Sequence, residues 1–252
     1  MSDIEQSGFS EFDREYPLRI SALGPKTESV PAFLSSLAAA MESIASFRTT
    51  FGDRASIEQF EMPLPADFMA ETLNEIRSRV LDPGLNTFWE SPASAAENTI
   101  ELIAESNRDR PGPRLGFKLR TGGVTADAFP SSAQIATALS AAGTRGVPIK
   151  FTAGLHHPVR RFHDSVQTRM HGFLNVLGAG VLALEHDWNE AQIVEMLEDE
   201  ETASFSFSDG VFTWRDASIS AERIRAHRQL VTSFGSCSFD EPREDLRALK
   251  LL

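Results

Sequence analysis

The chain has 252 residues, of which 41% are hydrophobic and 24% are charged, so it can bury a substantial core and is not a disordered chain. Its formal net charge of -12 repels phosphate backbones, which disfavours general nucleic-acid binding. Residues 1–20 are polar and acidic without an apolar signal core, and no run approaches the roughly 20 apolar residues of a membrane helix. The single cysteine, Cys237, cannot form an internal disulfide, so we expect a cytoplasmic protein with no nucleic-acid or membrane partner.

Strand-like and helical runs alternate along the first two thirds of the chain. Strands are predicted at 18–25, 56–65, 86–92, 114–123 and 147–154. Helices are predicted between them at 30–51, 66–81, 93–109 and 131–146, the last with Gly146 as its C-terminal stop. The later part predicts helices at 171–186, 189–200, 220–231 and 243–249, a hairpin at 204–216 and a last strand at 233–239.

Repeated strand–helix pairs imply parallel strands joined by right-handed crossovers. A doubly wound open sheet and a closed (β/α) barrel both fit this alternation. About seven strands, with no Gly-rich dinucleotide turn after the first, favour an α/β protein with a TIM-like barrel, irregular or incomplete. We expect a single domain over residues 17–252, preceded by a loose lead-in at residues 1–16.

Polar residues occupy the carboxyl ends of the predicted strands, where a barrel forms its active site. The residues at these ends are Glu61, Glu90, Lys118, Arg120, Lys150 and Thr152. Because side chains alternate along a strand, Lys118 shares a face with Arg120, and Lys150 shares one with Thr152. Charges in a strand covered on both faces are costly unless they meet counter-charges or a ligand.

Two interpretations of these strand ends remain open. In the first, Lys118 and Lys150 pair with Glu61 and Glu90 in a structural layer of ion pairs. In the second, burial beside another cation favours a neutral lysine amine, which can attack a carbonyl or act as a general base. Arg120 would then hold a carboxylate or phosphate with its planar fork of donors.

Two loops carry further candidates for binding an anionic substrate. Thr121, Gly122 and Gly123 follow the fourth strand and allow a tight turn that exposes backbone N–H groups, although a plain turn explains them equally well. Ser236 and Ser238, in the last strand and the loop after it, could donate hydrogen bonds to a phosphate. Cys237, between them in the alternation, is predicted to fill the core, and no partner base is recognisable for it.

Histidines near the fifth strand are candidates for acid–base chemistry. His156 and His157 lie in the loop after that strand, and His171 begins a helix with Asn175 one turn later. A metal site would combine His156 or His157 with His171 and one of Glu61, Glu90 or Asp164, but no HxH or HExxH spacing supports it. The remaining histidines are expected to be solvated: His163, His186 and His227.

Four blocks of sequence together resemble a group of uncharacterised bacterial proteins of similar arrangement. They are KLRTGGVTADAFPS, KFTAGLHHP, HGFLN and FGSCSFDEP, within residues 118–242. This resemblance implies that the blocks build one site, and it implies no substrate. A looser likeness is to aldolase-type barrels, which place lysines at inner strand ends, although a clear aldolase lysine motif is absent here.

The first functional hypothesis is a lyase or isomerase that acts on a small anionic carbonyl or enolisable metabolite without a cofactor. Lys150 would be the nucleophile or base beside Lys118, while Glu61 or Glu90 and His156 or His157 move protons. The alternatives are a metal-dependent hydrolase that uses the histidines with a glutamate, and a non-catalytic protein that binds a small anion. Barrels of this kind also often form homodimers.

Overall fold

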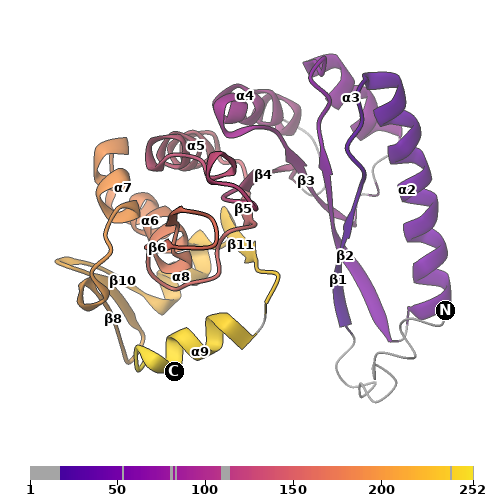
Figure 1. Ribbon diagram of the computed structural model, residues 1–252. Coiled ribbons are helices and arrows are strands. Elements are labelled where there is room, and N and C mark those ends of the chain that lie inside the picture. The colour runs from indigo at the N-terminus through magenta and orange to yellow at the C-terminus, as the bar shows by residue number, and fades with distance from the viewer. Residues whose placement is uncertain are drawn as a thin grey trace. The chain divides into compact units, whose positions relative to one another are not determined.

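The computed structural model describes residues 18–52, 54–79, 82, 84–108, 114–238 and 240–251 (Figure 1). The chain groups into two compact units: Met1–Trp89 with Asp109–Arg114, and Glu90–Arg108 with Leu115–Leu252. The predicted lead-in at residues 1–16 lies outside the described residues, and the single domain over 17–252 stays a prediction.

The first unit contains strands followed by helices, as the alternation predicts. Its elements are β1 (Leu18–Leu23), α2 (Val30–Phe51), β2 (Ala55–Pro63), α3 (Ala70–Arg79) and β3 (Asn86–Glu90, of which Glu90 is grouped with the second unit). β1 and β2 pair in parallel, from Leu18 opposite Ala55 to Leu23 opposite Glu61. Trp89 packs against Phe33 with ring centroids 5.6 Å apart, which joins β3 to α2 in the core of this unit.

Helix α2 runs alongside β1 and β2 in Figure 1. Ser29 caps its N-terminus by accepting a hydrogen bond from the backbone N–H of Ala32. Contrary to the sequence-based expectation, this helix is long and apolar enough by length and composition to span a membrane. Phe33, Leu37 and Ile44 are buried on one face, but only 17% of its most apolar 18 residues are buried. The core helix of a globular protein and a signal sequence both pass the same test of length and composition.

The second unit holds three parallel strands, β4 (Gly116–Arg120), β5 (Ile149–Thr152) and β11 (Val231–Gly235), in the order β4-β5-β11. Its helices are α4 (Ala96–Asn107), α5 (Ser132–Arg145), α6 (Phe173–His186), α7 (Glu190–Leu197), α8 (Ala221–His227) and α9 (Asp240–Ala248). Short 3-10 turns lie at Ala93–Ala95, Ala126–Ala128 and Thr202–Ser204. Helix α5 begins with a capping box of Ser131 and Gln134 and ends at Gly146 with φ 64°, the stop that the sequence predicts.

Two small antiparallel sheets complete the second unit. One pairs β6 (Arg161–His163) with β7 (Thr168–Met170), and the other has the order β10-β9-β8. The three strands of the latter are β8 (Phe205–Ser208), β9 (Val211–Trp214) and β10 (Ala217–Ser220). The first two are the predicted hairpin around Asp209 and Gly210.

The α/β class with parallel strands is confirmed, whereas a full TIM barrel is not shown. Among the described residues, β1 to β5 and β11 belong to the parallel strands, and β6 to β10 form the small antiparallel sheets instead. The physical reason lies in the sequence between β5 and β11, where strands of three or four residues joined by short turns favour local hairpins over helical crossovers.

Candidate functional site

The carboxyl ends of β4, β5 and β11 present two rows of polar side chains on one face. In the strand register Lys118 lies opposite Lys150, which lies opposite Ser233. The next row on the same face, two residues on, contains Arg120 and Thr152, and Gly235 opposite Thr152 leaves β11 without a side chain in this row. Lys118 and Lys150 are 7% and 5% exposed, so two ammonium groups on neighbouring strands are held largely out of water.

A carboxylate meets the first of these lysines. Glu90, the last residue of β3, lies with Oε2 2.9 Å from Lys118 Nζ, and both side chains are mostly buried. Glu61 belongs to the first unit, where it is buried and accepts a hydrogen bond of 2.5 Å from Ser21 Oγ. The pairing of Lys118 with Glu90 agrees with both interpretations of the strand ends, because a structural ion pair and a proton-transfer pair have the same geometry.

Two residues next to the lysines are exposed or unsatisfied. Arg120 ends β4 as an exposed residue, so its guanidinium can reach an incoming anion. The hydroxyl oxygen of Thr152 is buried and has no hydrogen-bond partner within the described part of the chain. A buried hydroxyl without a partner is destabilising, and a bound ligand could satisfy it.

The loop after β4 is packed more tightly than a plain anion-binding turn requires. Thr121 is fully buried, and its hydroxyl donates to the carbonyl of Ala153 at 2.6 Å, so it fastens this loop to the loop after β5. A Cβ at Gly122 would lie 2.8 Å from Gly154 Cα, and one at Gly123 would lie 2.6 Å from the methyl carbon of Ala128. Gly122 is therefore needed for close packing of the two loops, and Gly123 for packing of the loop after β4 on its own 3-10 turn at Ala126–Ala128.

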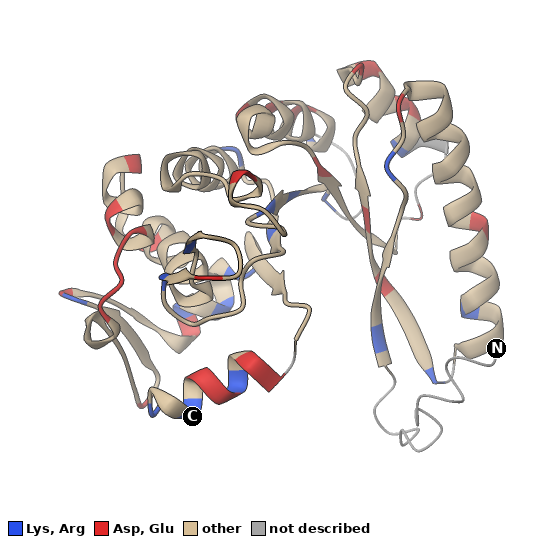
Figure 2. Cartoon of the chain, in the orientation of Figure 1, with Lys and Arg blue, Asp and Glu red and all other residues tan. Residues whose placement is uncertain are grey.

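The adjacent histidines both meet helix α9. His156 Nδ1 lies 2.8 Å from Glu241 Oε2, and His157 Nδ1 lies 2.6 Å from Asp245 Oδ2. Glu241 and Asp245 are one helical turn apart, and Figure 2 shows the density of acidic residues along this helix. Because a carboxylate can only accept, each Nδ1 carries the proton that it donates, and each Nε2 remains as a basic nitrogen in the neutral ring.

Cys237 lies beside the ring of His156, so the prediction of a core-filling cysteine without a base is wrong. Its side chain is exposed, and Sγ lies 3.6 Å from His156 Nε2 and 3.9 Å from Nδ1. The alternation argument failed because β11 ends at Gly235, and the chain enters an irregular loop before the cysteine. The serines on either side stabilise this loop: Ser236 Oγ accepts from the N–H of Ser238, and Ser238 Oγ accepts from the N–H of Glu241.

A pocket of about 420 Å³ lies beside the histidine pair. Its walls are formed by Gly123, Val124, His156, His157, His163, Ser165, Val166, Met170 and Glu241. His163, expected to be solvated, is half-buried and stacks on His157 with ring centroids 5.4 Å apart. His157 Nε2 is buried and has no partner among the residues that the structure describes.

His171 and Asn175 lie in a packed polar network, and their predicted role in substrate binding stays a prediction. His171 Nδ1 lies 3.1 Å from a guanidinium nitrogen of Arg160, and Nε2 lies 2.7 Å from the carbonyl oxygen of Pro130. Burial, with a smaller contribution from the charge of Arg160, lowers the pKa of His171 to about 4. The Asn175 amide donates to the carbonyls of Met196 and Asp199 and accepts from the N–H of Arg160.

This network leaves His171 without a free nitrogen for a metal ion. Asp164, another candidate ligand, is exposed. Over the described ranges, no group of three or more His, Cys, Asp or Glu side chains is arranged to hold a metal ion. The other two histidines expected to be solvated differ from each other: His186 is exposed, whereas His227 is half-buried and lies 2.7 Å from Glu185.

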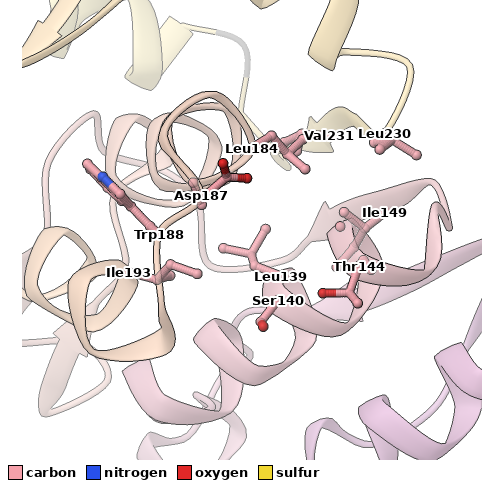
Figure 3. A pocket seen from close by; sticks show the side chains of 14 residues that line it. Leu139, Ser140, Thr144, Ile149, Leu184, Asp187, Trp188, Ile193, Leu230 and Val231 are labelled. Atoms are coloured by element: carbon pink, nitrogen blue, oxygen red, sulfur yellow. The ribbon is translucent and has the colours of Figure 1, made fainter.

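Figure 3 shows a second cavity, of about 290 Å³, that none of the predicted site residues lines. Apolar side chains form most of it, with Asp187, Thr144 and Ser140 among its polar groups. Asp187 ends α6 in the left-handed conformation with φ 53°. The residues that line this cavity belong to the packing between helices. Their polar groups do not point toward one common position.

The local sequence does not reveal all residues of the site. Glu241 and Asp245 were missed as partners of the histidines, because they are 85 and 88 residues away along the chain. The available signal was their spacing of four on a short terminal helix, which places two carboxylates on one face and matches two adjacent histidines.

The fold and these side chains define an α/β protein with a polar cluster at the carboxyl ends of the parallel strands of its second unit. Comparison of the chain with models of protein families, with curated proteins and with solved structures finds no match.

Proposed function

We propose that the protein is an enzyme of the lyase or isomerase type that acts on a small anionic carbonyl or enolisable metabolite. One observation carries the proposal: Lys118 and Lys150 lie side by side on a buried strand face, with Glu90 on the first lysine. A strand that is covered on both faces normally carries apolar residues at such positions. Burying charged groups there is costly, so we infer that these charges are kept for a function and not for packing.

Lys150 is the nucleophile in this proposal. Its neutral amine would add to the substrate carbonyl, and loss of water would give an iminium ion that accepts electrons from the adjacent carbon. The Lys118–Glu90 pair would take the proton released at that carbon and return it to the product. Hydrolysis of the iminium ion would then restore the amine, so the cycle needs no cofactor.

The residues around the lysines suit an anionic substrate. Arg120 is exposed at the end of β4 and would bind a carboxylate or phosphate through two parallel hydrogen bonds. The buried hydroxyl of Thr152, on the same face as the lysines, would donate a hydrogen bond to a substrate oxygen. The proposal further treats the parallel strands as part of an incomplete TIM-like barrel of a cytoplasmic protein, which could form a homodimer.

Borohydride trapping tests the role of Lys150. The purified protein is incubated with a panel of small 2-oxo acids and phosphorylated ketoses, reduced, digested and mapped by mass spectrometry. We expect an adduct on Lys150 that is lost in Lys150→Met and retained in the matched control Lys26→Met, because Lys26 is an exposed lysine. Adducts spread equally over Lys26 and Lys150 would contradict the proposal.

Thermal shift separates catalysis from simple anion binding. A ligand that binds the folded state raises the melting temperature, by an amount set by its concentration relative to its Kd. If Arg120→Ala removes the shift while no compound forms an adduct or is converted, the site binds an anion without catalysis and the enzymatic proposal fails.

A further inference from the structure

We propose that Cys237, His156 and Glu241 form a nucleophilic centre that hydrolyses small activated acyl compounds, with a thioester or an activated ester as the substrate class. This centre is separate from the lysines of β4 and β5. It rests on side chains from two segments that are far apart in the sequence: the loop after β5, and the loop after β11 with the first turn of α9 that follows it.

The hydrogen-bond chain sets the direction of proton transfer. Glu241 Oε2 lies 2.8 Å from His156 Nδ1, so the carboxylate accepts the Nδ1 proton and holds the ring with Nε2 unprotonated. That nitrogen lies 3.6 Å from Cys237 Sγ, which is also 3.9 Å from Nδ1, so the sulfur lies beside the ring. A rotation of the cysteine side chain must bring the thiol into line with Nε2 before its proton can pass. Nucleophile, base and orienting carboxylate are thus arranged in the order that nucleophilic catalysis requires.

A second observation points to a ligand at this place. The pocket of about 420 Å³ is lined by His156, Glu241 and His157, whereas Cys237 lies outside this lining and adjoins the pocket through its contact with His156. His157 is 4% exposed, and its Nε2 is buried without a partner in the described part of the chain, while Asp245 engages Nδ1 at 2.6 Å. A buried acceptor without a partner is destabilising, so a ligand that supplies a hydrogen-bond donor to this nitrogen would be favoured here.

The chemistry of these groups favours an activated acyl substrate. A thiolate attacks an acyl carbon readily, and a thiolate or an activated alkoxide leaves from the tetrahedral intermediate without strong acid assistance. The pocket volume lies near the lower end of the range for small-molecule sites, so it suits a short acyl group. The site is therefore matched to a small thioester or ester.

Each step conserves atoms and charge. His156 Nε2 takes the Cys237 proton, the thiolate bonds to the acyl carbon, and the bond from that carbon to the leaving sulfur or oxygen breaks as His156 returns the proton to it. Water then loses a proton to His156 and attacks the acyl-enzyme, which releases the carboxylic acid and restores the thiol. The net reaction consumes one water for each thioester or ester.

The experiment uses the full chain, p-nitrophenyl acetate and S-acetyl-N-acetylcysteamine. Because Cys237 is the only cysteine, a burst of product equal to the protein concentration can be assigned by finding one acetyl group on it. We expect no burst in Cys237→Ala. We also expect a burst rate about 100-fold lower in His156→Gln, in line with the usual size of general base catalysis, and a normal rate in the control His186→Gln.

Iodoacetamide gives a readout that does not depend on turnover. The alkylation rate of Cys237 as a function of pH should shift toward that of a free thiol in both His156→Gln and Glu241→Gln, with melting temperatures near that of the wild type. Acetylation confined to lysines, or an alkylation profile indifferent to His156→Gln, would overturn the proposal. Lys150→Met should keep the burst and Cys237→Ala should keep borohydride trapping, so this centre and the proposed lysine chemistry can fail independently.

Discussion

The buried imidazole of His171 makes the stability of the fold depend on pH in one direction. An arginine can only donate, so Nδ1 accepts the hydrogen bond from Arg160, and Nε2 carries the proton that it donates to Pro130. Protonation of Nδ1 would break the bond to Arg160 and place two cations side by side in a site that is 1% exposed. This arrangement explains why the pKa of His171 is lowered to about 4, chiefly by burial.

The size of the effect follows from linkage. In the unfolded chain the pKa returns to about 6.5, so between the two values the unfolded state binds more protons and stability decreases as the pH falls. The folded state loses about 2 kcal/mol between pH 7 and pH 5 from this group, and about 3 kcal/mol once the pH is well below 4. The loss is absent above the unfolded pKa and complete below the folded pKa.

Urea denaturation at several pH values between 7 and 4.5 measures this loss. His171→Gln is the matched variant, because its amide oxygen can accept from Arg160 and its NH₂ group can donate to Pro130 without titrating. We expect this variant to cost about 1 kcal/mol at pH 7, in line with a perturbed hydrogen bond, and to be as stable as the wild type or more stable at pH 5. All other titrating groups are present in both proteins. Their contributions therefore cancel when the free energies of unfolding of the wild type and the variant are subtracted at each pH.

Two results would refute the reasoning. The first is a pair of parallel stability curves for the wild type and His171→Gln over this pH range. The second is an NMR titration in which the His171 ring protonates near pH 6.5, as an exposed histidine does.

Three further predictions concern packing around the site. Asn175→Ala should lower the free energy of unfolding by about 3 kcal/mol in urea denaturation, because it leaves buried backbone groups without partners. Gly122→Ala places a Cβ 2.6 Å from an aromatic ring carbon and should cost about 1–3 kcal/mol by calorimetry, whereas the control Gly235→Ala meets its nearest atom at 3.6 Å and should cost much less. Lys118→Met should cost about 3–5 kcal/mol by leaving the carboxylate of Glu90 unpaired, and the double change with Glu90→Gln should restore much of that stability in the same assay.

The sequence predicts those parts of the fold that short-range patterns determine. The apolar run of β5 and the helical period of α5 lie within single segments, and the capping box at Ser131 and the left-handed Gly146 mark the ends of that helix. Strands β6 and β7, of three residues each, are too short to give a period, so the sequence predicts no strand there and only a solvated His163.

The residues of the candidate site also divide into those that a short-range pattern predicts and those that only the tertiary fold brings together. The alternation of Lys118 with Arg120 and of Lys150 with Thr152 was enough to anticipate two rows on one face, because neighbouring parallel strands align their carboxyl ends. The ion partners of the histidines come from a helix at the far end of the chain, and only the tertiary fold decides which side of α9 turns toward them. Long-range pairing of this kind leaves no periodic trace in either segment.

The loop after β5 links the two proposed sites physically. Ala153 and Gly154 adopt left-handed conformations, with φ 64° and 75°, and two such residues in succession redirect the chain from the strand that carries Lys150 toward α9. Gly122 approaches Gly154 so closely that a side chain there must move this loop. Gly122→Ala should therefore reduce both borohydride trapping and the acyl burst, whereas Lys150→Met and Cys237→Ala each remove only one of them. If the glycine change left both readouts at wild-type levels, the redirected loop would not be what positions either set of reactive groups.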